Sequence, residues 1–207
     1  MKQASSTFYV VRHGETHWNA ARRIQGHSDI PLNEIGIQQA TKAATALAHV
    51  PFDMAFSSDL LRAHRTAEII AAEHALVVKT TEVLRERFYG TLEGKDVQEL
   101  DLLHNQLSTL LSAERDAHRA SFNVESDESV VRRLITFIRE TAIAYPGKTV
   151  LIVCHGGLIR QLLHELGCYP RTLERRVRVG NTGFVAFETD GADFSVKEIS
   201  GVTLLDA

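Results

Sequence analysis

The most strand-like segment of the chain is TVLIVC, residues 149–154, and it is followed directly by His155-Gly156-Gly157. Its apolar residues occupy positions that would face both sides of a strand, which is typical of a central strand in a parallel sheet covered on both faces. The residues after it have helical period over 158–166, and Gly167 is expected to end that helix. This unit of strand, turn and helix predicts an α/β fold.

Shorter apolar runs alternate with segments of helical period along the rest of the chain. The expected strands cover 8–11, 54–56, 76–79 and 149–154, with a C-terminal hairpin of 183–188 and 194–199. The expected helices run from Asn33 to Leu47, from Asp59 past Ile70, and over 97–111, 129–144 and 158–166, with cap-type residues at Asn33, Ser57-Ser58-Asp59 and Ser126-Asp127. We therefore predict a three-layer α/β sandwich, with a mixed, mostly parallel sheet of about six strands, helices on both faces and a single domain over 1–207.

The composition is that of an ordinary globular chain of 207 residues, of which 44% are hydrophobic and 24% are charged. A formal net charge of -3 gives no general attraction to nucleic acid or to anionic membranes, and no segment approaches the roughly 20 apolar residues of a membrane span. The two cysteines, Cys154 and Cys168, are expected to be free thiols, because a disulfide scaffold needs many more. These features favour a cytoplasmic protein that binds neither nucleic acid nor membrane, and they leave the oligomeric state open.

Cationic and imidazole side chains follow three of the expected strands. Arg12-His13-Gly14 comes after the first strand, Arg62 lies in the first turn of the helix after the second, and His155-Gly156-Gly157 comes after the central strand. Ligands of open α/β sheets bind beyond the carboxyl ends of the strands, so these groups are expected to meet, with a glycine after each histidine for close backbone approach. Guanidinium groups and helix N-termini bind a phosphoryl group, and histidine can accept it covalently. Each feature alone is also typical of a structural or solvated residue, but together they indicate phosphoryl transfer.

Five ordered blocks of sequence carry a family resemblance. They are VRHGETHWN at 11–19; QG at 25–26 with DIPLN at 29–33 and Gly36; SSDL at 57–60 with Arg62-Ala63 and Thr66-Ala67; LRER at 84–87 with Gly90 and Glu93-Gly94; and VCHGG at 153–157. Through these blocks the chain closely resembles the histidine phosphatase superfamily, the phosphoglycerate mutase-like proteins, over most of residues 8–188. A lone Arg-His-Gly triplet would be weak evidence, whereas five blocks in family order are very specific.

The resemblance implies a role for each matching residue. His13 is the expected nucleophile that becomes phosphorylated, and Glu86 is the expected proton donor and later the base that activates water. Three residues are expected to stabilise the charge on the transferred phosphoryl oxygens: Arg12, Arg62 and His155. The expected substrate or phosphate contacts are Thr16, Asn19, Gln25, Gly26, Tyr89 and Gly157, and packing is an equal alternative for Tyr89. The resemblance implies no metal and no other cofactor, because the arginines supply the positive charge that magnesium supplies elsewhere.

Phosphatases and mutases of this family share that core. The resemblance implies that cofactor-dependent mutases grip a second phosphate with an Asn-Lys pair and with adjacent arginines that follow a tryptophan. Here Asp96-Val97 stands in place of the Asn-Lys pair, the only tryptophan is Trp18, and Gly156-Gly157 stands where the mutases have Gly-Asn. We therefore expect hydrolysis of a small phosphorylated metabolite, such as a sugar phosphate. Phosphoglycerate mutase activity is the first alternative, and a non-catalytic module that binds phosphorylated ligands is the second.

Several other residues have a plainer interpretation. A zinc site at His13 and His17 is disfavoured, because Gly14 argues against the helix that such a pair needs. His17 and His27 are left open between the pocket entrance and the surface, whereas Cys154 is expected to be a core thiol. Surface positions are expected for His49, His74, His104, His118, His164 and the pair Arg132-Arg133. Substrate specificity is expected to come from the charged segment 113–127 and from the loop around Gln25.

Overall fold

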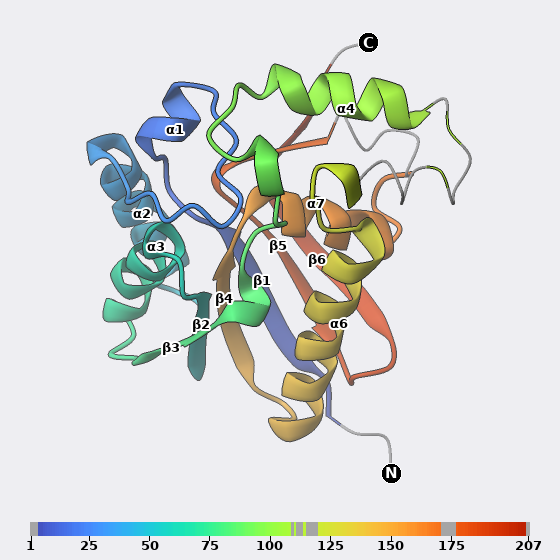
Figure 1. Ribbon diagram of the computed structural model, residues 1–207. Helices are drawn as coiled ribbons and strands as arrows, with labels where there is room; N and C mark the ends of the chain where they lie inside the picture. Colours follow the sequence, from blue (N-terminus) through green and yellow to red (C-terminus); the bar gives the residue numbers. More distant parts are fainter. Residues whose placement is uncertain (1–3, 109, 111–113, 115–119, 171–176, 206–207) are drawn as a thin grey trace.

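A computed structural model describes residues 4–108, 110, 114, 120–170 and 177–205, and its centre is a six-stranded sheet in the order β3-β2-β4-β1-β5-β6 (Figure 1). The strands are β1 Ser6–Arg12, β2 Met54–Ser58, β3 Val78–Thr81, β4 Thr149–Cys154, β5 Val177–Thr189 and β6 Phe194–Leu204. The strands β1 to β4 run parallel, while β5 and β6 are antiparallel additions beside β1. The mixed, mostly parallel sheet is confirmed, and β5 and β6 form the expected hairpin with longer strands.

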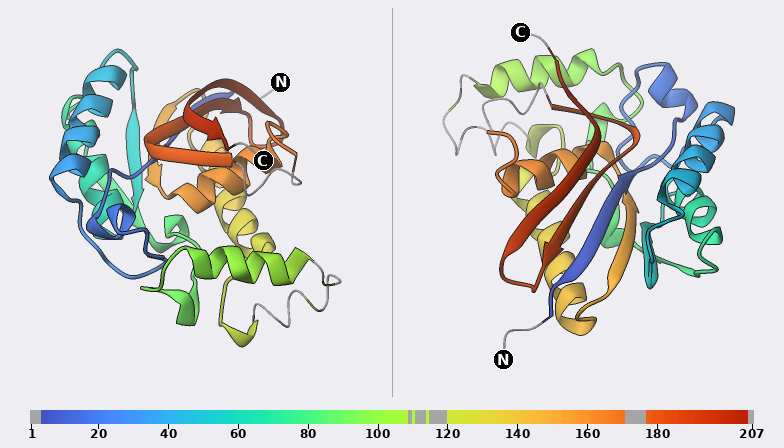
Figure 2. Two further views of the ribbon diagram at one scale, coloured as in Figure 1. Left: turned by 90° about the horizontal axis from the view of Figure 1, so that it is seen from above. Right: turned by 180° about the vertical axis from the view of Figure 1, so that it is seen from behind.

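Helices cover both faces of this sheet. They are α1 His17–Ala20, α2 Glu34–Leu47, α3 Leu61–Ala72, α4 Gln98–Ser108, α6 Asp127–Ala144 and α7 Gly156–Glu165, with 3-10 turns η1 Glu82–Leu84 and η2 Gly90–Leu92. Figures 1 and 2 show α2 and α3 on one face and α6 and α7 on the other, so the three-layer arrangement is confirmed. The expected helix over 97–111 is described as far as Ser108, and most of the expected specificity segment from 113 to 119 lies outside the described residues. Among the described helices, none is long and apolar enough to cross a membrane.

The two central strands send alternate side chains into two separate cores. Val10 of β1 and Ile152 of β4 belong to the core under α6 and α7, whereas Val11 and Val153 belong to the core under α2 and α3. Successive residues of a strand point to opposite faces, so an apolar residue at every position requires a covering layer on each side. The apolar segment 149–154 is therefore the centre of a three-layer structure.

A third, smaller core lies beyond the end of the sheet where β1 leads into α1. It joins five buried residues from the loop at Ile24, the 3-10 turn η2 and the helix α4: Ile24, Tyr89, Leu92, Leu103 and Leu107. Figure 1 shows α4 lying across this end of the molecule. Loops and one helix thus lie beyond the carboxyl ends of the parallel strands, the end at which ligands bind in open α/β sheets.

Two of the three expected helix caps are confirmed. Asn33 Oδ1 accepts a hydrogen bond of 2.7 Å from the N–H of Gly36 at the start of α2. Ser126 Oγ accepts one of 3.2 Å from the N–H of Ser129 at the start of α6. A side-chain oxygen at this position satisfies one of the free N–H groups of the first turn.

The expected cap at Ser57-Ser58-Asp59 is wrong. The helix α3 begins at Leu61 after the N-cap residue Leu60, whose apolar side chain cannot accept a hydrogen bond. Asp29 takes that role instead, because its Oδ1 accepts a hydrogen bond of 2.7 Å from the N–H of Leu61. A residue from a distant loop therefore caps this helix, and a local sequence pattern cannot reveal such a contact.

The loop after β1 rests directly on the helix α2. A Cβ atom at Gly36 would lie 2.1 Å from the carbonyl oxygen of Glu15, and a Cβ atom at Gly14 would lie 2.4 Å from the carbonyl oxygen of Gly36. Both neighbours are backbone atoms, which cannot rotate away as a side chain can. The glycine after His13 therefore allows a close backbone approach, as expected, and the approach is between two segments of the protein.

The close approach of Gly36 to Glu15 predicts that Gly36→Ala destabilises the protein. In a helix, Gly→Ala alone stabilises by about 0.5–1 kcal/mol, but overlap with packed neighbours costs about 1–3 kcal/mol. We expect Gly36→Ala to lower the free energy of unfolding, measured by chemical denaturation, by about 1–2 kcal/mol. Gln38→Ala, on the exposed face of the same helix, is the control and should change it by less than about 0.5 kcal/mol. A Gly36→Ala variant more stable than the wild type would contradict the contact.

Candidate active site

The two predicted active-site histidines lie side by side. His13 follows β1 and His155 follows β4, and these strands are neighbours in the sheet. The His13 N–H donates a hydrogen bond of 3.0 Å to the carbonyl oxygen of Cys154, and the two imidazole rings meet edge to face with centroids 5.2 Å apart. His13 is 3% exposed and His155 is 0% exposed. The strand ends thus bring together the two histidines, as predicted.

One hydrogen bond determines which nitrogen of His13 is free to react. The Nδ1 atom of His13 lies 2.6 Å from the carbonyl oxygen of Gly14. A carbonyl oxygen only accepts hydrogen bonds, so Nδ1 must carry the proton. In the neutral ring, the lone pair is then on Nε2. The geometry therefore presents Nε2 of His13 as the nucleophilic atom.

Both predicted arginines reach the site, and each is held by backbone carbonyl groups. Arg62, in the first turn of α3, is fully buried and donates hydrogen bonds of 2.7 Å to the carbonyl oxygen of Ser28 and 2.8 Å to that of Gly26. Arg12 donates one of 2.6 Å to the carbonyl oxygen of Val179. The predicted contact residue Gly26 therefore contacts Arg62 through its backbone.

Several buried nitrogen atoms around His13 have no hydrogen-bond partner among the described residues. They are Arg12 Nε, Arg62 Nε, His155 Nδ1 and His155 Nε2. Buried polar groups are nearly always paired, and a buried guanidinium group strongly favours a neighbouring anion. This arrangement can bind an anion with several acceptor oxygens.

Burial and like charge together keep the histidines neutral. Burial lowers the pKa of His13 well below its ordinary value, and the positive charges of Arg62 and Arg12 lower it further. Burial, then Arg62, likewise lower the pKa of His155. Burial also lowers the pKa of Arg12 and of Arg62 to about 10 each, although Glu86 opposes that shift in both. At neutral pH the arginines therefore carry the positive charge and His13 keeps a lone pair.

Glu86 lies at the N-terminus of α7. Its Oε2 accepts a hydrogen bond of 3.0 Å from the N–H of Gly157, and its Oε1 accepts one of 2.8 Å from the N–H of Arg87. A Cβ atom at Gly157 would lie 2.4 Å from Glu86 Oε1, so a larger residue here would displace this carboxyl group. Gly157 was expected to donate to a phosphate, whereas in this structure its N–H group donates to Glu86.

Three further predicted contact residues form one hydrogen-bonded group at the start of α1. The hydroxyl of Thr16 lies 3.0 Å from Gln25 Oε1 and 3.2 Å from Asn19 Oδ1, and it accepts a bond of 3.1 Å from the Asn19 N–H. The Thr16 N–H also donates to Asn19 Oδ1. The amide oxygens of Asn19 and Gln25 therefore both face Thr16. Tyr89 is buried with Ile24 and Leu92 in the third core, which supports the packing alternative for that residue.

Sequence reasoning missed three residues that support the site. Glu93 accepts hydrogen bonds from the N–H groups of His27 and Ser28, at 2.9 and 3.0 Å, and so shapes the loop whose carbonyl groups hold Arg62. Thr66 Oγ1 accepts a bond of 3.0 Å from the Gly14 N–H, and Asn181 Nδ2 donates one of 3.0 Å to the carbonyl oxygen of His13. Glu93 and Thr66 stand in the five family blocks, so their presence there was the available signal. Asn181 stands outside them.

Two of the expected surface positions are wrong, and a third, His74, is half-buried with its ring edge to face against Phe52 at a centroid distance of 5.0 Å. His164 is buried, and its Nδ1 donates a hydrogen bond of 2.8 Å to the carbonyl oxygen of Tyr169. The side chain of Arg133 is only 20% exposed and binds carbonyl groups near Glu86, whereas its neighbour Arg132 is 69% exposed as expected. The helix α6 turns these adjacent side chains in different directions, because successive helical residues do not share a face.

The remaining predictions concern histidines and a thiol. His17 is exposed on α1, whereas the Nε2 atom of His27 lies 2.9 Å from the carbonyl oxygen of Glu86. Cys154 is buried as expected, and burial raises the pKa of its thiol. Among the described residues, no group of three or more His, Cys, Asp and Glu side chains lies close enough to hold a metal ion. His118 and the side chain of His104 lie outside the described part of the chain.

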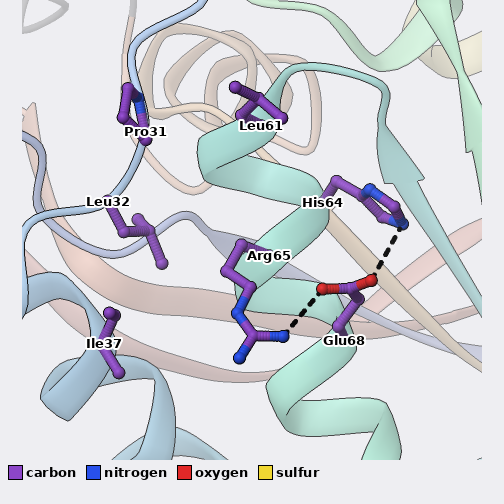
Figure 3. A pocket seen from close by; sticks show the side chains of 7 residues that line it. All are labelled: Pro31, Leu32, Ile37, Leu61, His64, Arg65 and Glu68. Carbon is purple, nitrogen blue, oxygen red and sulfur yellow. Dashed lines mark hydrogen bonds and ion pairs between the residues drawn. The ribbon is translucent and has the colours of Figure 1, made fainter.

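A groove of about 430 Å³ is lined by residues of α2, of α3 and of the loop before α2 (Figure 3). Its lining is Pro31, Leu32, Ile37, Leu61, His64, Arg65 and Glu68. Glu68 pairs with Arg65 at 2.9 Å and with His64 at 3.7 Å across one wall. None of the predicted site residues lines this groove, so it is separate from the histidine pair.

The fold and this site place the chain in a known class of proteins. It matches the model of the histidine phosphatase superfamily (branch 1) over residues 8–200, and the chain belongs to that family. It is 36% identical over 183 residues to phosphoglycerate mutase-like protein 4 of Arabidopsis thaliana. The aligned residues cover 87% of this chain and 80% of that protein.

Solved structures are similar over nearly the whole chain. The phosphoglycerate mutase of Bacillus anthracis has a TM-score of 0.81 at 27% identity, covering 95% of this chain and 93% of that one. The phosphoserine phosphatase of Entamoeba histolytica, in complex with 3-phosphoglyceric acid, has a TM-score of 0.79 at 29% identity, covering 94% and 96%. The fold is therefore shared by relatives named as mutases and as phosphatases.

The lowered pKa of His155 predicts how stability changes with pH. Below about pH 6.5 the unfolded chain binds a proton at this residue and the folded chain does not, so stability falls by up to about 1.4 kcal/mol per pH unit. We expect His155→Asn, which cannot titrate, to weaken the fall in the free energy of unfolding between about pH 7 and about pH 5. Chemical denaturation at several pH values measures this. The exposed His49→Asn is the control and should keep the wild-type slope; equal slopes for all three proteins would contradict the burial effect.

Proposed function

We propose that the protein is a phosphomonoester hydrolase that transfers a phosphoryl group to His13 and then to water. The observation that carries this proposal is the set of buried, unpartnered nitrogen atoms of Arg12, Arg62 and His155 beside the unprotonated Nε2 of His13. A phosphoryl group offers several acceptor oxygens and negative charge, which match these donors. Catalysis of phosphoryl transfer depends mainly on positioning and on stabilising that charge.

The proposed reaction has two steps, and a residue of the site takes part in each bond that forms or breaks. His13 Nε2 attacks phosphorus and the ester P–O bond breaks, while Glu86 in its acid form gives a proton to the leaving oxygen. In the second step a water oxygen attacks the phosphorus, Glu86 takes a proton from that water, and the N–P bond to His13 breaks. Arg12, Arg62 and His155 contact the phosphoryl oxygens in both steps. Inorganic phosphate and the free alcohol are the products.

The second-phosphate contacts of a mutase are not supported by the residues at the matching places. Asp96 stands where the Asn-Lys pair is expected, and its backbone pairs with that of Arg23 in an isolated bridge. Of the adjacent arginines, Arg132 pairs with Glu128 on the exposed face of α6 and Arg133 binds backbone carbonyl groups. A phosphohistidine at His13 would therefore meet water more often than a second phosphorylated acid. This supports a phosphatase over the mutase alternative.

The substrate we propose is a small phosphorylated metabolite. The phosphoserine phosphatase of Entamoeba histolytica, similar in fold, was solved with 3-phosphoglyceric acid, which belongs to that chemical class. The arginines supply the positive charge, so we propose that no metal ion and no other cofactor takes part. The two free cysteines are consistent with a cytoplasmic location.

The nucleophile is tested by replacing His13. We expect His13→Asn to lower kcat for para-nitrophenyl phosphate by a factor of at least about 10³, because the variant lacks the proposed nucleophile. Vanadate should inhibit the wild type and EDTA should not. Mass spectrometry of the acid-quenched wild type should find a phosphoryl group on His13, and circular dichroism should show that the variant is folded. Full activity of His13→Asn would rule out the proposed nucleophile.

Hydrolysis and mutase activity are separated by a panel of substrates. We expect phosphate release from small phosphorylated metabolites such as 3-phosphoglycerate, fructose 2,6-bisphosphate and nucleotides, measured by a phosphate assay. Phosphate migration between positions of phosphoglycerate, followed by NMR, should be at least about tenfold slower than release, because the second-phosphate residues differ. Migration without release would show that the protein is a mutase.

A further inference from the structure

Glu86 lies in a segment without the backbone hydrogen bonds of a helix or a strand. Residues 85–89, all of them described, lie between the 3-10 turns η1 and η2 and belong to neither helix nor strand. A general acid must stay within hydrogen-bond distance of the atom it protonates, and a misplacement of about 1 Å can cost about 10²-fold in rate. Contacts from elsewhere in the fold must therefore hold the backbone of this segment.

Arg133 of α6 supplies two of those contacts, to the carbonyl groups of Arg85 and Glu86. Its Nη1 donates hydrogen bonds of 2.6 Å to the carbonyl oxygens of Val83 and of Arg85, and its Nη2 donates one of 3.2 Å to the carbonyl oxygen of Glu86. One guanidinium group thus holds two carbonyl groups of the segment, including that of Glu86 itself, and a third at Val83 in η1. The planar fork of arginine can do this, whereas the single ammonium group of lysine is a compact point charge.

Glu125 holds the guanidinium group from the other side. Its Oε1 accepts a bond of 2.9 Å from Arg133 Nε, and its Oε2 accepts one of 3.1 Å from Arg133 Nη2. Glu125 also ties down the far end of the segment, because its N–H donates a bond of 2.8 Å to the carbonyl oxygen of Phe88 and its Oε2 accepts one of 3.3 Å from the Phe88 N–H. The two side chains are 20% and 15% exposed, so solvent screens this pair less than a surface pair.

Neighbouring contacts hold the same segment from other directions. His27 Nε2 lies 2.9 Å from the carbonyl oxygen of Glu86. His27 belongs to the loop after α1, whereas Arg133 belongs to α6. The side chain of Arg85 pairs with Asp59 at the end of β2. The carboxyl group of Glu86 accepts a hydrogen bond from the N–H of Gly157, two residues after His155.

We infer that Arg133, held by Glu125, is a positioning residue that keeps the carboxyl group of Glu86 where it can protonate the leaving oxygen. This inference rests on the proposed function, in which Glu86 is the proton donor. Arg133 itself touches no reacting atom. Its loss should therefore impair the proton transfer and leave the binding of the phosphoryl group unchanged.

The choice of leaving group tests this role. An alkyl phosphate leaves as a strongly basic alkoxide that needs a proton, whereas para-nitrophenolate is a weak base that needs little help. We expect Arg133→Gln to lower kcat/KM for an alkyl phosphate by about tenfold and for para-nitrophenyl phosphate by less than about threefold. Inhibition by vanadate should stay within about twofold of the wild type, because Arg12, Arg62 and His155 are untouched. Arg132→Gln, the exposed neighbour on α6, is the matched control and should change none of these values.

Further variants separate positioning from general support of the fold. Arg133→Lys and Glu125→Gln should show a smaller change with the same preference for the good leaving group. In the double variant Glu86→Gln/Arg133→Gln, the loss on the alkyl phosphate should equal that of Glu86→Gln alone, because both changes act on one proton transfer. Equal losses on both substrates, weakened vanadate inhibition, or additive losses in the double variant would overturn the inference.

The same measurements distinguish this inference from the proposed function. If Glu86→Gln itself shows no dependence on the leaving group, then Glu86 is not the proton donor and the proposed mechanism fails. If Glu86→Gln shows that dependence and the folded Arg133→Gln and Arg133→Lys variants do not, then only the positioning role of Arg133 fails.

Discussion

The burial of two guanidinium groups beside two histidines is the constraint on which the site depends. Removing Arg12 and Arg62 from water is costly, and the cost is offset by hydrogen bonds to the carbonyl oxygens of Val179, Gly26 and Ser28 and by the nearby carboxylate of Glu86. The same positive charge, together with burial, keeps His13 neutral. One arrangement thus attracts an anion and leaves a lone pair on the nucleophile.

Backbone carbonyl groups hold the three arginines described above, and for Arg62 and Arg133 most of these carbonyl groups lie outside helices and strands. Arg62 depends on the loop at 26–28, Arg12 on β5, and Arg133 on residues 83–86. Loops can present several carbonyl oxygens to one guanidinium group, because their backbone is not committed to a ladder or a helix. The loops in turn need side chains such as Glu93 and Glu125 to hold them in place. The rigid sheet positions the histidines, and this network positions the charges around them.

Most of the fold could be predicted from the sequence, because it depends on local periodicity. The apolar run 149–154 predicted the central strand, and Asn33 and Ser126 predicted the starts of two helices. The failures involve contacts between distant segments. The cap of α3 comes from Asp29, and β3 lies two residues later than expected, at Val78–Thr81, in register with β2. The sequence next to Leu61 does not indicate the cap from Asp29, and the sequence of β3 does not indicate its pairing register with β2.

The identity of the central groups could also be read from the chain, because parallel strands end at the same edge of a sheet and thereby bring His13 and His155 together. The finer chemistry follows from three-dimensional geometry. The proton position on His13, the use of the Gly157 N–H by Glu86, and the role of Arg133 all depend on hydrogen bonds that form only after the chain has folded. Periods of 2 and about 3.6 residues record which face is buried, but they carry no information on the direction of a donor toward a distant carbonyl group.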